Sequence, residues 1–109
     1  MHTVVETPTY LAAATKAGMT EAERAAAVLI VSKNPTAGDM ISGGGGARKI
    51  RVPRHGKGKS GGYRVITYYM EENEPVFLLS VLSKSKQDNL SDAHKQEVKR
   101  VAKEIRDDR

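Results

Sequence analysis

The 109-residue chain contains no cysteine and no tryptophan. Without cysteine it can form no disulfide framework, no thiolate metal site and no thiol nucleophile. No apolar run approaches the ~18 residues that span a bilayer, and the N-terminal segment lacks the basic and apolar regions of a signal peptide. A length of 109 residues suits a single domain over residues 1–109. The absences favour a protein that functions in the cytoplasm without contacting a membrane.

A second absence is more informative, because the segment from Met40 to Met70 has no acidic residue. Within a chain of net charge +5, this segment carries seven arginines and lysines. They are Arg48, Lys49, Arg51, Arg54, Lys57, Lys59 and Arg64. Charge of one sign at this density favours a polyanion as partner, most simply a nucleic acid. A charged hairpin that is merely solvated is the alternative that the composition leaves open.

Hydrophobic periodicity and turn residues predict the element order β-α-α-β-β-β-α. This is an α+β fold with a small, mainly antiparallel sheet, and the helices are expected to cover one face of it. Thr20 and Glu23 form a capping box that starts the second helix, in which Ala26, Leu29 and Ile30 are expected to face the core. The expected strands are 3–6, 48–53, 63–69 and 76–82, the expected helices are 9–17, 20–33 and 91–109, and residues 36–46 are expected to form a loop.

Alternation along residues 48–53 separates the basic side chains from the apolar ones. Ile50 and Val52 are expected to enter the core, so Lys49 and Arg51 would share the opposite face. Arg64 opens the next strand and is expected to join them on that face. No carboxylate is expected there, which disfavours a two-metal nuclease. The histidines lack metal-ligand spacing, so no metal site or cofactor is predicted; one of them, His94, is expected to be solvated.

The run GGARKIRVPRHGKGKSGGYRVITYY, followed by LLSVLSKSKQDNLS, resembles the RelE/HigB family of bacterial type II toxins, and especially its HigB-like branch. The resemblance covers about residues 44–91. It implies a RelE-like fold and a ribosome-dependent endoribonuclease that cuts messenger RNA and inhibits translation. It implies metal-independent attack by the ribose 2′-hydroxyl on the adjacent phosphate. The implied partners are the ribosome, mRNA and a cognate antitoxin, often one with a helix-turn-helix domain.

The resemblance also assigns roles to residues. It places Lys49, Arg51 and Arg64 in catalysis, with a further basic residue at Lys84 or Lys86. The side chains expected to bind RNA around this site are Arg48, Arg54, Lys57, Lys59 and Tyr63. The residue that protonates the leaving group stays open among Lys84, Lys86 and His55. Two other functions stay open: a non-catalytic RNA- or ribosome-binding module, and a degenerate toxin that acts with its antitoxin in operon regulation.

Overall fold

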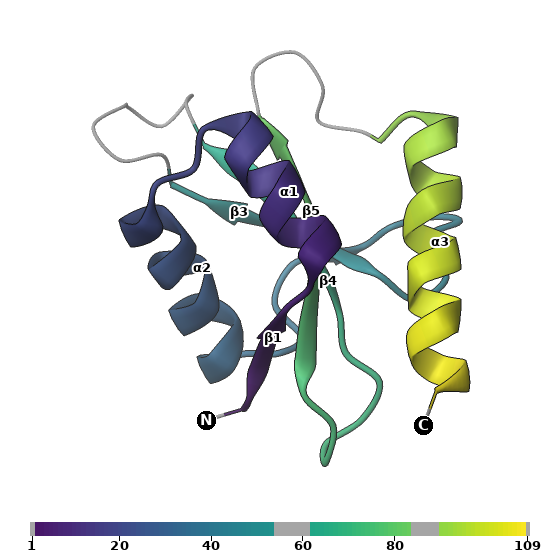
Figure 1. Cartoon of the computed structure of the whole chain (residues 1–109). Helices are drawn as coiled ribbons and strands as arrows, with labels where there is room; N and C mark the ends of the chain where they lie inside the picture. Colours follow the sequence, from purple (N-terminus) through teal and green to yellow (C-terminus); the bar gives the residue numbers. More distant parts are fainter. Residues whose placement is uncertain (1, 54–61, 84–89, 109) are drawn as a thin grey trace.

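The computed structural model describes residues 2–53, 62–83 and 90–108 of the chain. These residues form three helices and a five-stranded mixed sheet, an α+β fold as predicted (Figure 1). In chain order the elements are β1 (Val4–Glu6), α1 (Pro8–Ala17), α2 (Glu21–Lys33), β2 (Asp39–Met40), β3 (Arg48–Val52), β4 (Tyr63–Tyr68), β5 (Val76–Ser83) and α3 (Asp92–Asp107).

The strands follow one another across the sheet in the order β1-β5-β4-β3-β2. β3, β4 and β5 form the antiparallel meander that the sequence predicts, and β1 adds to β5 as a parallel edge strand. The short strand β2 pairs with the start of β3. It lies within residues 36–46, so the prediction that this whole segment is a loop was wrong.

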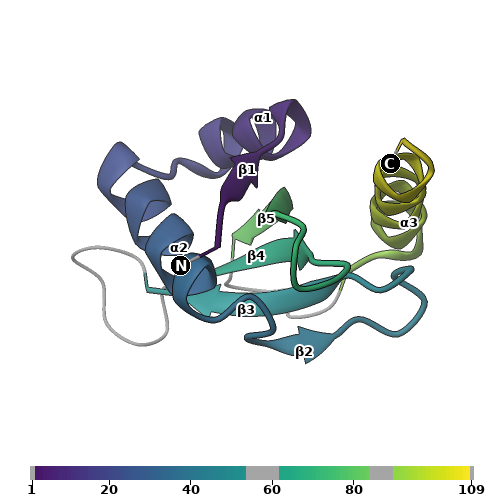
Figure 2. The same ribbon diagram turned by 90° about the horizontal axis from the view of Figure 1, so that it is seen from below.

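Helices cover both faces of the sheet, which corrects the expectation that they cover only one. In Figure 2, α1 and α2 lie together on one side of the strands, whereas α3 lies apart from them beside β5. Neighbouring residues of β4 show the same division. Val65 belongs to the core cluster that contains Tyr10 of α1 and Val31 of α2, whereas Ile66 belongs to the cluster that contains Val98 of α3.

Local signals place the helix ends where the sequence predicts them. The Thr20 hydroxyl accepts from the backbone N–H of Glu23, and the Glu23 carboxylate accepts from the N–H of Thr20. Gly18 ends α1 with a φ of 82°, a left-handed conformation that glycine adopts without steric cost. The buried face of α2 differs from the prediction, since Ala27 and Val31 are buried while Leu29 is 48% exposed.

Candidate functional site

The structure places Lys49, Arg51 and Arg64 on the same face of the sheet. In the β3–β4 register Arg51 lies opposite Arg64, and Lys49 lies opposite Ile66. Cβ atoms of directly opposed residues are about 4.5–5.5 Å apart, so the two arginines emerge side by side. The intervening residues Ile50 and Val52 are buried, as the alternation predicts. The strands therefore present these three cations as a fixed group, here called the basic face.

Gly62 allows the two arginine side chains to lie close to the backbone. A Cβ atom added at Gly62 would come within 3.1 Å of the Val52 carbonyl oxygen. It would also lie 3.5 Å from Cγ of Arg51 and 3.7 Å from Nη1 of Arg64. A Cβ atom here would crowd the Val52 carbonyl oxygen, whereas its distances to the two arginine side chains are those of ordinary van der Waals contact. Gly62, directly before β4, thus leaves the backbone beside both arginine side chains uncovered.

A carboxylate lies beside the basic face, contrary to the prediction. Asp39 of β2 is opposite Lys49 in the β2–β3 register. Together with the three cations it lines a shallow hollow of about 500 Å³. The remaining lining residues are Ile30, Ala37, Gly38 and Ile50. The expectation of a face without carboxylates was therefore wrong, and the hollow contains both a possible proton acceptor and phosphate-binding cations.

The segment before β2 is fixed against β3 by Arg48 and Gly38. Nη1 of Arg48 donates to the carbonyl oxygens of Thr36, at 3.2 Å, and of Gly38, at 3.4 Å. Gly38 has a φ of 89°, and a Cβ atom there would lie 2.3 Å from the Lys49 carbonyl oxygen. Only glycine fits this approach, which positions Asp39 next to Lys49. Arg48 therefore organises the margin of the hollow.

A family model described as the RelE toxin of the RelE / RelB toxin–antitoxin system matches residues 3–108. The match covers nearly the whole chain. The chain belongs to the RelE toxin family. It is therefore a toxin-type protein whose system includes an antitoxin partner, and its mixed sheet with three helices agrees with the RelE-like fold.

Tyr63 and Tyr68 of this RelE-family chain are buried, so neither ring is available to stack on an RNA base. Tyr63 is 1% exposed in the core beneath α1 and α2, and its hydroxyl donates to Oε1 of Glu23 at 3.2 Å. The prediction that Tyr63 contacts RNA is corrected accordingly, because alternation sends its ring to the face opposite Arg64. Tyr68 is also buried, and its hydroxyl accepts from Nη1 of Arg106 at 3.3 Å.

The structure also changes the environment expected for His94. Its Nε2 lies 3.0 Å from Oγ of Ser80, within hydrogen-bond distance, and its ring is half-buried. The expectation that His94 is simply solvated was wrong, since α3 folds back onto β5 and the first turn of the helix meets Ser80. Sequence reasoning missed this contact because it assigned α3 to the other face.

Several predicted site residues lie outside the described residues. They are Arg54, His55, Lys57, Lys59, Lys84 and Lys86. Within the described ranges, no group of three histidine or acidic side chains is arranged to hold a metal ion. No helix in those ranges is long and apolar enough to cross a membrane.

Proposed function

We propose that this RelE-family chain is a ribosome-dependent mRNA endonuclease of the HigB-like branch that inhibits translation in the cytoplasm. The observation that carries the proposal is the register of β3 and β4, which sets Arg51 opposite Arg64, with Lys49 two pairs further along opposite Ile66. Like charges placed directly opposite each other are destabilising, so the arrangement suits an anion that bridges them. A phosphate of a bound RNA strand has the charge and the oxygen geometry for this role.

The reaction proposed at this face is an intramolecular transesterification. The ribose 2′-oxygen forms a bond to the adjacent phosphorus, and the bond between phosphorus and the 5′-oxygen of the next nucleotide breaks. The products are a 2′,3′-cyclic phosphate and a 5′-hydroxyl. Negative charge increases on the phosphoryl oxygens in the transition state, and fixed guanidinium groups stabilise that charge without having to reorganise. Arg51 and Arg64 are the groups proposed for this role, and Lys49 adds a third positive charge.

Two proton transfers complete the reaction. Asp39 lines the same hollow as Lys49 and Arg64, so its carboxylate can accept the proton of the 2′-hydroxyl. Lys49, the alternative acceptor, faces it across the β2–β3 pair. The proton for the departing 5′-oxygen is proposed to come from Lys84, Lys86 or His55. No metal ion is required in this scheme, because side chains supply both the charge stabilisation and the proton transfers.

The decisive experiment compares wild type with Arg64→Ala on ribosomes programmed with a defined mRNA. Primer extension locates the cut, and filter binding measures RNA affinity in the same samples. Removing a donor that stabilises transition-state charge costs roughly 10²–10³-fold in rate. We therefore expect a loss of that order in cleavage, with a much smaller loss of affinity. Lys33→Ala, a loss of one exposed charge at the end of α2, is the matched control and should cleave normally.

The other outcomes decide between the remaining functions. A wild-type chain that binds ribosomes tightly but never cuts mRNA would identify a non-catalytic binding module. A chain that neither cuts mRNA nor arrests growth when expressed alone would exclude the toxin function and indicate a degenerate toxin. We further propose that the cognate antitoxin has a helix-turn-helix domain, and co-expression with that antitoxin should restore growth.

A further inference from the structure

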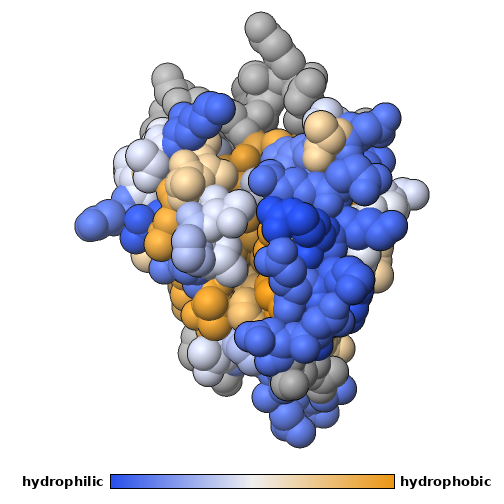
Figure 3. All heavy atoms as spheres, turned by 45° about the vertical axis from the view of Figure 1, so that its right-hand side comes forward, coloured by the Kyte–Doolittle hydropathy of each residue, from blue (hydrophilic) through white to orange (hydrophobic). Residues whose placement is uncertain are grey.

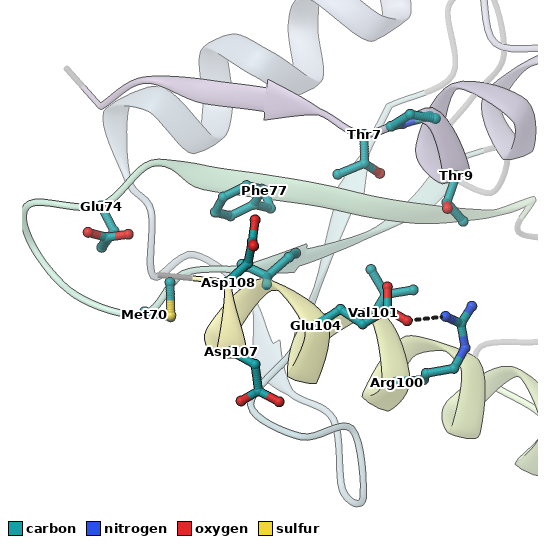
Figure 4. Close-up of a pocket in the computed structure, with 12 residues that line it drawn as sticks. Thr7, Thr9, Met70, Glu74, Phe77, Arg100, Val101, Glu104, Asp107 and Asp108 are labelled. Atoms are coloured by element: carbon teal, nitrogen blue, oxygen red, sulfur yellow. Dashed lines mark hydrogen bonds and ion pairs between the residues drawn. The ribbon is translucent and has the colours of Figure 1, made fainter.

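The two flanks of α3 carry opposite charge. Figure 3 shows a hydrophilic ridge along the exposed side of this helix. On one flank Glu104 and Asp108 line a hollow, in which Arg100 is paired with Glu104 (Figure 4). Lys99 and Arg106, which are about two turns apart, lie together on the opposite flank. A polyanion is therefore repelled from the first flank and attracted to the second.

The loop between β2 and β3 lies against this cationic flank (Figure 2). Nη1 of Arg106 donates to the carbonyl oxygen of Gly45, at 3.2 Å, and to the Tyr68 hydroxyl, at 3.3 Å. A Cβ atom at Gly45 would lie only 3.2 Å from Cγ of Lys99. α3 therefore holds the loop in place and brings Lys99 and Arg106 next to the loop backbone.

The glycines of this loop present unused backbone donors. Gly43, Gly45 and Gly46 have φ values of 75°, 70° and 101°, which residues other than glycine rarely adopt. The N–H of Gly44 donates to the Ile41 carbonyl oxygen at 3.0 Å. The N–H groups of Gly45 and Gly46, in contrast, have no acceptor within residues 2–53, 62–83 and 90–108. Successive backbone N–H groups in turns of this kind form concave binding sites for anions.

A hollow of about 390 Å³ joins the glycine backbone to two arginines. Its lining includes Gly45, Gly46, Arg48 and Arg106. Glu71 is the one acidic side chain among the described residues that line it, so the two arginines leave the lining positive. Within the described part of the chain Arg106 makes its hydrogen bonds through Nη1, and its Nε and Nη2 are available to a ligand. This hollow, with Lys99 adjoining it, is here called the glycine-loop site.

α3 and the basic face lie on the same side of the sheet. Ile66 packs in the core cluster beneath α3, and Lys49 lies opposite Ile66 in the register, so the cations of β3 and β4 emerge on the α3 side. Arg48, which lines the glycine-loop site, precedes Arg51 by three residues, or about 10 Å at ~3.3 Å per residue. The glycine-loop site and the basic face are therefore separate, but one RNA strand can contact both.

We propose that the glycine-loop site binds a second phosphate of the RNA strand that is cut at Arg51 and Arg64. This second contact presupposes the proposed function, in which the same strand is cleaved at the basic face. Backbone N–H groups and a guanidinium are strong donors to phosphate oxygens, and the contacts of Arg106 with Gly45 and Tyr68 already fix both in place. A contact this far from the reacting bond binds substrate and transition state equally. It should therefore lower KM and leave kcat unchanged.

Cleavage kinetics on ribosomes programmed with a defined mRNA test this second contact. Arg106→Gln should raise the toxin concentration at half-maximal rate by roughly three- to tenfold, with the maximal rate unchanged. Arg106→Lys keeps the charge and should recover most of the loss. Arg100→Gln removes one charge from the acidic flank of the same helix and should behave like wild type.

Neutral methylphosphonates, substituted in turn for each mRNA phosphate near the cleaved bond, identify the phosphate that is bound. At one position the substitution should weaken wild type as much as Arg106→Gln does, and should weaken Arg106→Gln no further. A defect of Arg106→Gln that adds to the effect of every methylphosphonate would place the contact on ribosomal RNA and overturn the proposal. An Arg106→Gln variant with the circular dichroism and the cleavage kinetics of wild type would also overturn it.

NMR of the free chain separates this proposal from the proposed function. The amide resonances of Gly45 and Gly46 should shift on titration with a 2′-O-methyl octanucleotide, which cannot be cleaved, and Arg106→Gln should reduce the shifts several-fold. Amides that do not shift, in a chain that does cut mRNA, would exclude the second phosphate site alone. Shifted amides in a chain that never cuts mRNA would retain the site and exclude the proposed function. An equal response to ATP would assign the site to a free nucleotide and overturn the proposal.

Discussion

Arg51 and Arg64 occupy directly opposed positions on β3 and β4, so two guanidinium-bearing side chains leave the same face of the sheet next to each other. Opposed like charges in an antiparallel pair are destabilising, whereas opposite charges would stabilise it by roughly 0.2–1 kcal/mol. The register thus brings two like charges together in the free protein. An anionic ligand would interact favourably with both guanidinium groups. The repulsion between them also yields a prediction about stability.

Arg51→Gln is expected to raise the free energy of unfolding by a few tenths of a kcal/mol at low salt, because it removes one of the two opposed charges. The gain should shrink as salt is raised, since screening weakens the repulsion in the wild type. Urea denaturation at 20 mM and 500 mM salt measures both effects. Lys99→Gln, which neutralises an exposed lysine of α3, is the control for a general reduction of net charge. An equal gain in the control would show that the opposed pair is not the cause.

The part of the site that was predictable depends on period-two alternation. Ile50 and Val52 had to be buried for β3 to join a sheet, and this alone placed Lys49 and Arg51 on the other face. Capping residues located α2 equally well, since the Thr20–Glu23 pair acts within a single turn. These signals are local, so each predicts its structural result without knowledge of the long-range packing.

The parts that escaped prediction depend on long-range packing. β2 has two residues and no alternating pattern, so nothing local indicated that Asp39 would lie opposite Lys49. α2 contains an unbroken apolar run, so the sequence does not show which side of the helix faces the core. Nothing therefore indicated that Leu29 would be exposed. The side of the sheet that α3 covers is decided by its packing on Ile66, and the helix sequence alone does not specify it.

A pair of glycine substitutions tests how far the site depends on the close approach of β2. Gly38→Ala and Gly43→Ala both place alanine at a positive φ, 89° and 75°, and so share the backbone penalty of roughly 1 kcal/mol. Only at Gly38 does the added Cβ atom also meet the Lys49 carbonyl oxygen, at 2.3 Å. We expect Gly38→Ala to lose about 1–3 kcal/mol more stability than Gly43→Ala, and to lose RNA cleavage. Equal melting temperatures for the two variants would contradict the close approach.

The buried contact between Tyr63 and Glu23 gives a third prediction. Tyr63→Phe keeps the ring in the core and removes the hydroxyl that donates to Oε1 of Glu23. The N–H of Thr20 still donates to that carboxylate, so the loss should be that of one hydrogen bond to a charged group, about 1.5–3 kcal/mol. Thermal denaturation measures this, and cleavage per folded molecule should stay at the wild-type rate. Reduced cleavage at full stability would instead point to a direct role of the hydroxyl in RNA binding.

The alkaline limit of stability is predicted to depend on Tyr10. Burial raises the pKa of Tyr10 to about 12, and the nearby Glu6 carboxylate acts in the same direction. In the unfolded chain the tyrosine pKa is about 10. Because the folded-state pKa is the higher of the two, the unfolded state loses its proton first. The stabilisation is therefore complete below pH ~10 and is lost as pH rises towards ~12, with a total of about 2–3 kcal/mol.

Tyr10→Phe isolates this effect, because phenylalanine fills the same site and cannot ionise. The Tyr10 hydroxyl makes only a weak contact with Sδ of Met19, at 3.9 Å, so the substitution should cost little at pH 8. Urea denaturation of both proteins from pH 8 to pH 11.5 provides the comparison. The difference in unfolding free energy should move steadily in favour of Tyr10→Phe above pH 10, since lysine titration affects both proteins alike. A difference that stays constant over this range would mean that Tyr10 ionises as readily in the folded chain as in the unfolded one.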